Sequence, residues 1–450
     1  MNHPEITPLE SWIASKIGLN DGRDLTMETL ARYQLQKINA TIRYASRNSP
    51  FYKELLSGDS SGSLSSLRDL SRLPFTSAED IRCDPYQFLC VSQDRVSRVV
   101  TLRTSGTTQS PKRIFFTDSD LELTIDFFHH GMSTLVRPGQ RVLILMPGEL
   151  PGSVGDLLTK GLARMSVLGF VHGPIEDNSE VVNEILHKKI DCLVGIPAQV
   201  MSLARSIEGS TIGSERIKSV LLSADYVPKP VIRELERIWE CKVFQHYGMT
   251  ETGLGGGVEC EAFSGYHLRE ADLYYEIIDP VYGRPVSDGK TGEVVFTTLT
   301  REAMPLIRYR TGDLASLIPA PCPCDSILKR MSPVRGRVSG VVSLVGTQGI
   351  SMSDLDEAIF AVSGVMSYQA EICALKGRDH LKISVYTEMK NSAFILERVH
   401  DVVMAIPLIR DAVARKAIQL DRVALGPTGR PTTGVVKRGI VDLRDKANAL

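Results

Sequence analysis

The stretch Val142-Leu143-Ile144-Leu145 is a continuous apolar run in a chain of 450 residues. Similar runs follow at residues 192–195 and 220–223, and helix-like stretches such as residues 180–189 lie between them. Continuous apolar runs are typical of strands buried on both faces, and the intervening helices predict crossovers between parallel strands. Residues 121–224 are therefore predicted to form doubly wound α/β layers around a parallel sheet.

The hydrophobic pattern changes after Gly253. Residues 273–278 and 293–298 alternate and are rich in β-branched side chains, which predicts an antiparallel, β-rich subdomain. A proline-rich loop ends near residue 335, where we place a boundary between an N-terminal domain, 1–335, and a C-terminal α+β domain, 336–450. The C-terminal domain is expected to contain helices at 354–362 and 393–405 and strands at 369–375, 382–387 and 417–425.

Composition narrows the classes of function. The 52 Lys+Arg balance 53 Asp+Glu, so no net field attracts nucleic acid or an anionic membrane, and a small-molecule partner is expected. The first residues lack the basic and apolar segments of a signal peptide, and no apolar stretch approaches the length of a membrane span. Eight cysteines without a secretion signal predict reduced thiols in a cytoplasmic protein.

A hydroxyl-rich turn follows an apolar strand and ends in a lysine. Backbone N–H groups near a glycine can approach phosphate oxygens, hydroxyls donate further hydrogen bonds, and a lysine adds a positive charge. The spacing excludes a Walker loop, and the alternative is a turn without a ligand. The predicted phosphate-binding residues are Thr104, Ser105, Gly106, Thr107, Thr108 and Lys112.

Two further segments carry groups suited to a nucleotide. Tyr247, Gly248, Thr250 and Glu251 place an aromatic ring, a tight turn, a hydroxyl and a carboxylate within five residues. Tyrosine offers a stacking face, and carboxylate oxygen is a ligand that Mg²⁺ prefers. Asp313 can accept hydrogen bonds from a pair of ribose hydroxyls, or it forms an ion pair with a neighbouring arginine.

These segments, in this order, resemble the adenylate-forming superfamily of acyl-CoA synthetases, and the match is closest to the phenylacetate:CoA ligase family. The resemblance covers almost the whole chain, and several blocks in one order are more specific than any single motif. The matching blocks are 43–45, 49–52, 73–76, 104–112, 136–139, 195–197, 247–251, 276–280, 297–303 and 305–310.

The resemblance implies a two-step reaction, in which a carboxylate attacks the α-phosphate of ATP-Mg²⁺ and a thiol, usually coenzyme A, then displaces AMP. It implies that the 104–112 turn holds the β- and γ-phosphates and that the C-terminal domain is mobile. It also implies these roles: Ser223, Ala224, Asp225 and Tyr247 beside adenine; Thr250 and Glu251 at the α-phosphate and Mg²⁺; Asp313 at the ribose; and Arg337 at the nucleotide.

The sequence departs from the family pattern at three places. Gln109 replaces a glycine of the phosphate turn, and Ser339 lies near the position of the usual acidic hinge residue. Val435 occupies the place of the adenylation lysine. In an extended segment Lys437 points to the same side as Val435, so it is our candidate catalytic lysine; the alternative is a surface lysine.

Four separated residues form a possible metal-ligand set: Cys260, His267, Cys322 and Cys324. Thiolates and imidazole are ligands that Zn²⁺ prefers, and such a site would fix the loop at 319–332 to the β-rich region. Cys241 is a competing ligand, and ordinary buried thiols are the alternative.

The expected function is ATP-dependent ligation of an aromatic or arylalkyl carboxylic acid to coenzyme A, with ATP, Mg²⁺ and CoA as the bound molecules. The alternatives are an adenylating enzyme with another acceptor and a nucleotide-binding homologue with weakened catalysis. Met-Pro-Gly-Glu at 146–149 replaces the expected tyrosine- and glycine-rich segment, which disfavours phenylacetate itself. A homodimer is one expected assembly.

Overall fold

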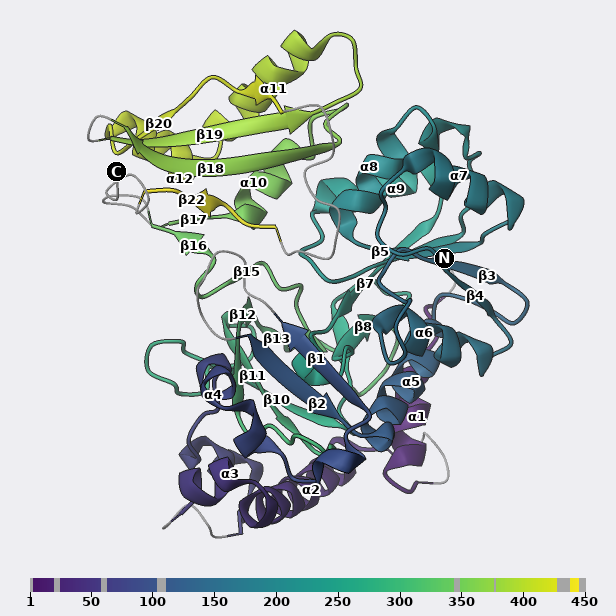
Figure 1. Ribbon diagram of the computed structural model, residues 1–450, viewed down its shortest axis with the longest axis vertical. Helices are drawn as coiled ribbons and strands as arrows, with labels where there is room; N and C mark the ends of the chain where they lie inside the picture. Colours follow the sequence, from purple (N-terminus) through teal and green to yellow (C-terminus); the bar gives the residue numbers. More distant parts are fainter. Residues whose placement is uncertain are drawn as a thin grey trace. The chain divides into compact units, whose positions relative to one another are not determined.

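The computed structural model describes residues 3–19, 25–57, 63–102, 111–343, 349–375, 378–426 and 438–444 (Figure 1). The chain forms two compact units, each built from three segments. Unit 1 contains residues 1–138, 150–167 and 244–334, and unit 2 contains residues 139–149, 168–243 and 335–450.

The helices of unit 1 come mainly from the first third of the chain, and several begin with capped ends. In α2, the Thr26 hydroxyl accepts a hydrogen bond from the Thr29 N–H, and the Thr29 side chain accepts one from the Thr26 N–H. Such reciprocal caps satisfy N–H groups that the first helical turn leaves free. The helices are α1 (Pro8–Lys16), α2 (Met27–Asn48), α3 (Pro50–Leu55), α4 (Ala78–Cys83), α5 (Asp118–Met132) and α6 (Val154–Ala163), with 3-10 turns at Leu67–Arg72, Pro85–Phe88, Gln93–Arg95 and Thr250–Thr252.

The strands of unit 1 are antiparallel, which confirms the predicted β-rich subdomain. One sheet has the order β10-β11-β12, and another run of strands has the order β13-β14-β9-β8-β7. A separate hairpin pairs β1 with β2. The strands are β1 (Arg98–Leu102), β2 (Lys112–Phe116), β7 (Lys242–Tyr247), β8 (Gly257–Glu259), β9 (Tyr266–Leu268), β10 (Leu273–Ile278), β11 (Gly292–Thr298), β12 (Tyr309–Ala315), β13 (Leu317–Ile318) and β14 (Arg330–Met331).

The first part of unit 2 is the predicted α/β layer. Strands β6-β5-β3-β4 are hydrogen-bonded in this order, and every one of these pairs is parallel. After the half-buried Arg141 that begins one of them, the two central strands carry buried apolar side chains, as the sequence predicted. The elements are β3 (Arg141–Ile144), β4 (Leu168–Val171), α7 (Asn178–His187), β5 (Cys192–Gly195), α8 (Pro197–Arg205), a 3-10 turn at Gly209–Thr211, β6 (Ser219–Leu222) and α9 (Lys229–Trp239).

The C-terminal part of unit 2 is α+β. Long strands β18 and β19 form an antiparallel pair, with β20 and β21 beside β19 and β22 beside β18. The expected strand at 417–425 is wrong in detail, because residues 421–423 interrupt it, and α12 was not foreseen. The elements are β15 (Gly336–Arg337), β16 (Val341–Val342), β17 (Ile350–Ser351), α10 (Met352–Ile359), β18 (Ser367–Leu375), β19 (Arg378–Tyr386), α11 (Ser392–Met404), α12 (Pro407–Ala414), β20 (Ile418–Leu420), β21 (Ala424–Leu425) and β22 (Val441–Asp442).

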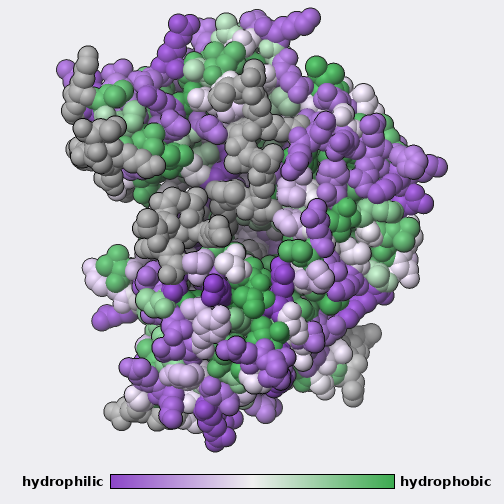
Figure 2. All heavy atoms as spheres, viewed as in Figure 1, coloured by the Kyte–Doolittle hydropathy of each residue, from purple (hydrophilic) through white to green (hydrophobic). Residues whose placement is uncertain are grey.

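Each unit has its own hydrophobic core. Ile38, Phe88 and Phe296 belong to the core of unit 1, and Leu193, Trp239 and Val399 belong to that of unit 2. Polar side chains cover much of the outer face of helices α7 and α9, as Figure 2 shows. Among the helices of the described ranges, none has the length and apolar character required to cross a membrane.

Candidate functional site

A buried carboxylate lies at the centre of the candidate site in unit 1. Glu251 follows β7 in a 3-10 turn, and its Oε1 forms an ion pair with Nζ of Lys112, the first residue of β2. The hydroxyl of Tyr309, at the start of β12, donates to the same oxygen at 3.0 Å. Nζ of Lys112 is 3.3 Å from the Tyr309 hydroxyl. Three segments that are distant in sequence thus meet at one carboxylate oxygen.

The electrostatics of Glu251 favour the charged form. Burial raises its pKa, but the attraction and hydrogen bond of Lys112, together with the Tyr309 hydroxyl, hold the pKa below the ordinary value of a glutamate. Nη1 of Arg301 donates to the Glu251 backbone carbonyl at 2.7 Å. Burial lowers the pKa of Arg301 to about 10, so this guanidinium is still charged at neutral pH. Glu251 is therefore a fixed anion at neutral pH.

Tyr247 and Asp313 form a second buried pair. The Tyr247 hydroxyl donates to Oδ2 of Asp313 at 3.2 Å. Burial and the neighbouring aspartate raise the pKa of Tyr247 well above its ordinary value, which keeps the hydroxyl as a donor. Arg308 instead pairs with Glu276 at 3.0 Å, and Arg310 pairs with Glu293.

The segment at 248–256 follows Tyr247 and contains Glu251. Its glycines allow the backbone to approach neighbouring groups closely. A Cβ added to Gly248 would lie 2.4 Å from the Leu254 carbonyl oxygen, so no other residue fits without a shift of the backbone. Thr250, half-buried, begins the 3-10 turn. A Cβ at Gly255 would lie 2.3 Å from the Phe127 ring, and one at Gly256 would lie 2.5 Å from the Tyr275 hydroxyl. The β7–β8 hairpin therefore packs directly on its neighbours.

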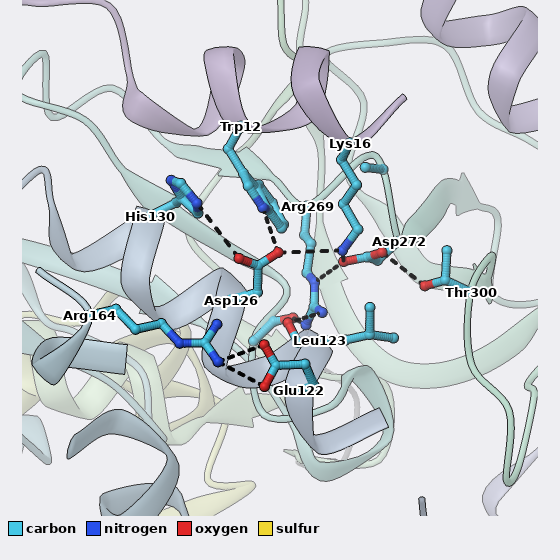
Figure 3. A network of polar contacts seen from close by, with 12 residues as sticks. Trp12, Lys16, Glu122, Leu123, Asp126, His130, Arg164, Arg269, Asp272 and Thr300 are labelled. Atoms are coloured by element: carbon cyan, nitrogen blue, oxygen red, sulfur yellow. Dashed lines mark hydrogen bonds and ion pairs between the residues drawn. The ribbon is translucent and has the colours of Figure 1, made fainter. Parts of the chain in front are cut away.

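A polar network around Asp272 (Figure 3) contacts this segment, because Nη1 of Arg269 donates to the Gly255 carbonyl at 3.4 Å. Oδ2 of Asp272 accepts from Lys16 at 2.8 Å and from Arg269 at 2.7 Å, while Oδ1 accepts from Thr300 at 2.8 Å. Thr300 precedes Arg301, which binds the Glu251 carbonyl. The network thus joins α1 to the segment that supports Glu251.

Other predicted residues belong to unit 2. Ser223 follows β6 and its N–H donates to the Gly195 carbonyl at 3.0 Å, and Ala224 has a left-handed φ of 71°. Asp225 accepts from the Arg438 N–H at 3.4 Å. Burial, and then the nearby Asp356, raise the pKa of Asp225. Arg337 is half-buried in β15.

Two sets of predicted residues fall outside the described ranges. They are Thr104, Ser105, Gly106, Thr107 and Thr108 of the phosphate turn, and Lys437 with Val435 near the end of the chain.

Each unit also contains residues that the sequence did not single out next to predicted ones. Tyr309 was visible only as part of a matching block, and nothing local connects it to Glu251. Arg438 forms an ion pair with Asp356 at 2.6 Å, although the two residues are separated by 82 positions. Arg301 was likewise not foreseen as a ligand of the Glu251 carbonyl.

Residues 72–299, just over half of the chain, match the family described as AMP-binding enzyme. The chain belongs to this family. Among curated relatives, the phenylacetate-coenzyme A ligase of Thermus thermophilus is 27% identical over 446 residues, which cover 93% of this chain and 98% of the relative. The phenylacetate-coenzyme A ligase of Escherichia coli is 26% identical over 383 residues, which cover 82% of this chain and 85% of the relative.

Solved structures of CoA ligases share the fold. A 2-hydroxyisobutyryl-CoA ligase in complex with 2-HIB-AMP matches with a TM-score of 0.77 and 21% identity, and the match covers 93% of this chain and 90% of that chain. An anthranilate CoA ligase in complex with anthranoyl-AMP matches with a TM-score of 0.57 and 15% identity, over 78% and 66% of the two chains. The predicted α/β class with a C-terminal α+β part is confirmed.

Proposed function

We propose that this protein is an ATP-dependent, AMP-forming ligase that activates a carboxylic acid and transfers it to coenzyme A. The observation that carries the proposal is the buried Glu251 carboxylate, which Lys112 and Tyr309 hold by one oxygen. Membership of the AMP-binding enzyme family and the names of the curated relatives support the same reaction.

The proposed chemistry has two steps. The substrate carboxylate attacks the α-phosphorus of ATP, which forms a mixed anhydride with AMP and releases pyrophosphate. The thiol of coenzyme A then attacks the acyl carbon, the bond to AMP breaks, and the thiol proton leaves to a base. A carboxylate is a poor electrophile because its oxygen is a poor leaving group, and conversion to the adenylate removes that obstacle.

Glu251 fits a role in binding Mg²⁺. Its carboxylate is hard, buried and held in the charged form, which are the properties that a magnesium ligand needs. Bound Mg²⁺ would neutralise charge on the ATP phosphates. Both described side-chain partners of Glu251 contact Oε1, so Oε2 is the oxygen that we assign to the metal.

The remaining roles are those that the family resemblance implies, and charge or hydrogen bonding supports two of them, those of Lys112 and Asp313. Lys112 carries a positive charge next to Glu251 and is assigned to phosphate oxygens, with Thr104, Ser105, Gly106, Thr107 and Thr108 beside it in sequence. Asp313 is assigned to the ribose hydroxyls, because its carboxylate accepts hydrogen bonds and Tyr247 fixes its orientation. Ser223, Ala224 and Asp225 are assigned to adenine, Thr250 to the α-phosphate, Arg337 to the nucleotide and Lys437 to adenylation.

The substrate assigned to this chain is an aromatic or arylalkyl acid. All four curated relatives are named phenylacetate-coenzyme A ligases. Residues 146–149 of this chain are Met-Pro-Gly-Glu, which disfavours phenylacetate itself as the substrate. Glu149 is exposed. The mobile C-terminal domain at 336–450, the homodimer and the cytoplasmic location stay predictions.

Pyrophosphate release by the purified protein tests the function. ATP-Mg²⁺ is supplied with a panel of aromatic, arylalkyl and aliphatic acids, each with and without coenzyme A. We expect release that requires an acid, and sustained turnover with acyl-CoA formation that requires CoA. Turnover that ignores CoA would indicate another acceptor. ATP binding without release for any acid would contradict the proposal and favour a homologue with weakened catalysis.

A further inference from the structure

Four potential metal ligands of unit 1 lie together, outside the nucleotide-binding residues assigned above. Cys260 follows β8, His267 lies in β9, and Cys322 and Cys324 lie in the loop from β13 to β14. All four side chains are buried, and His267 and Cys324 are 0% exposed. Their ligand atoms all lie within 4.8 Å of one another.

The distances between these atoms fit a tetrahedral zinc site. Sγ of Cys260 and Sγ of Cys322 are 3.7 Å apart, and Sγ of Cys324 is 3.5 Å from Nε2 of His267. With Zn–S bonds of about 2.3 Å and a Zn–N bond of about 2.0–2.1 Å, tetrahedral angles give about 3.8 Å between sulfurs and about 3.5 Å between sulfur and nitrogen. These two distances therefore match those between ligands of one tetrahedral ion, and all four ligand atoms lie within 4.8 Å of one another.

A disulfide and a simple apolar cluster explain the arrangement less well. A disulfide needs sulfurs about 2.05 Å apart, and all three cysteines are free thiols. Among the described residues, this hydrophobic cluster consists of the three cysteines with Ala262 packed beside it, so the sulfurs lie against one another. Cys241, the competing ligand considered from the sequence, instead lies in the hydrophobic core of unit 2.

The surroundings also suit thiolate ligands. The Ala262 N–H is directed at Sγ of Cys260 at 3.4 Å. N–H groups directed at ligand sulfurs are among the outer contacts that orient and stabilise a metal site.

We propose that Cys260, His267, Cys322 and Cys324 bind one structural Zn²⁺. Four protein ligands fill a tetrahedral ion and leave no open position for substrate or water. The ion joins the β8–β9 hairpin to the loop at 319–329, which is rich in proline and has little regular structure of its own.

The strands around the four ligands indicate which part of the fold the ion stabilises. His267 is the register partner of Arg330, and the Leu268 N–H donates to the Lys329 carbonyl at 3.2 Å. β9 pairs with β8, and β8 pairs with β7 through Tyr247 and Gly257. Zinc therefore stabilises the run of strands at whose end Tyr247 lies. Its loss is expected to reduce stability more than it reduces the intrinsic rate.

The metal content of the full-length protein is the first test. Protein purified without metal additives and dialysed against chelator-treated buffer is measured by inductively coupled plasma mass spectrometry. We expect about one zinc per chain, released when a mercurial reagent modifies the thiols. Less than about 0.1 zinc per chain, with no uptake from added zinc after thiol reduction, overturns the proposal, and so does stoichiometric iron in place of zinc.

Substitution locates the ion. Cys324→Ser and His267→Gln each remove one ligand, while Cys373→Ser in β18 of unit 2 makes the same chemical change away from the cluster. We expect zinc below about 0.2 per chain in the two ligand variants, unchanged zinc in the control, and a thermal midpoint lower by about 5 °C or more in the ligand variants. Full zinc retention in both ligand variants contradicts the assignment, because it places the metal elsewhere, for example at Asp126, His129 and His130.

Cobalt substitution keeps the test valid if the ligand variants do not fold. Zinc in the wild-type chain is exchanged for Co²⁺, whose absorption reports geometry and thiolate ligation. We expect the intense visible bands of tetrahedral cobalt and a thiolate-to-metal charge-transfer band in the near ultraviolet. Weak octahedral bands without charge transfer would contradict the site. None of these readouts depends on ligase activity, so a failure of the proposed function leaves them interpretable.

Discussion

Asp272 and Glu251 are two buried carboxylates of unit 1. Both interact with cationic and hydroxyl side chains, but we assign them different roles. Asp272 accepts on both oxygens, from Lys16 and Arg269 on one and from Thr300 on the other. The described side-chain partners of Glu251, Lys112 and Tyr309, both contact Oε1. In each case the cations hold the pKa of the carboxyl below its ordinary value despite burial. A carboxylate whose two oxygens both accept from side chains supports the fold, while one whose described side-chain partners share a single oxygen is suited to a ligand.

The largest expected effect is on stability, from Asp272→Asn. This change leaves Arg269 and Lys16 without their common anion, and removing one partner of a buried ion pair typically costs about 3–5 kcal/mol. Denaturant unfolding of a Trp239→Phe background leaves Trp12 as the only tryptophan of the chain. Because Trp12 lies in α1, its fluorescence reports unit 1. A loss in unfolding free energy below about 1 kcal/mol would contradict the assignment of Asp272, rather than Glu251, to supporting the fold.

Glu251→Gln should affect catalysis more than folding. Loss of one preorganised charged group typically reduces a rate by about 10²–10³-fold, and we expect a reduction of that size in adenylation. The Trp12 unfolding signal should change less than in Asp272→Asn, since Lys112 loses its anion but the Tyr309 hydroxyl is still close to it. Activity within threefold of wild type, measured over a range of Mg²⁺ concentrations, would argue against the metal role.

Tyr309→Phe is the smaller change at the same site. It removes one hydrogen bond to Glu251, and a hydrogen bond to a charged group contributes about 1.5–3 kcal/mol. The ion pair of Lys112 with Glu251 compensates for part of this free energy. We therefore expect a rise of about tenfold in the Mg²⁺ concentration needed for half-maximal rate. Thr300→Val is the matched control at Asp272, and it should leave that concentration unchanged.

Mild acidification should produce the smallest effect. A carboxylate with a lowered folded pKa contributes stability that is present above its unfolded pKa, about 3.9 for aspartate, and lost as pH falls through the folded pKa. The stability difference between wild type and Asp272→Asn should therefore be constant from pH 7 to about pH 5 and shrink below about pH 4. Unfolding measured against pH checks this, and a difference that already shrinks near pH 6 would contradict it.

The comparison also shows how far sequence reasoning extends. Glu251 and Tyr247 were singled out because their motif is local, and the parallel strands were predicted correctly because burial on both faces removes polar residues from them. The partnership of Glu251 with Tyr309 was not, because 58 positions separate the two residues and no local pattern encodes the pairing. Asp272 was missed for a similar reason, since its partners come from α1 and from Thr300.

The sequence did not predict the short elements of the C-terminal part correctly. The interruption between β20 and β21 and the eight-residue helix α12 depend on how the C-terminal segment packs onto β19. By contrast, the four cysteine and histidine residues were grouped correctly from their chemistry, although 64 positions separate the first from the last.

The close packing of the β7–β8 hairpin has a consequence for how this chain can vary. At Gly255 and Gly256, every substitution adds a Cβ that meets either the buried Phe127 ring or the buried Tyr275 hydroxyl. Neither position offers a milder replacement, because alanine already carries the atom that collides. If both positions are randomised and the library is selected for folded protein, glycine should therefore be recovered at each of them.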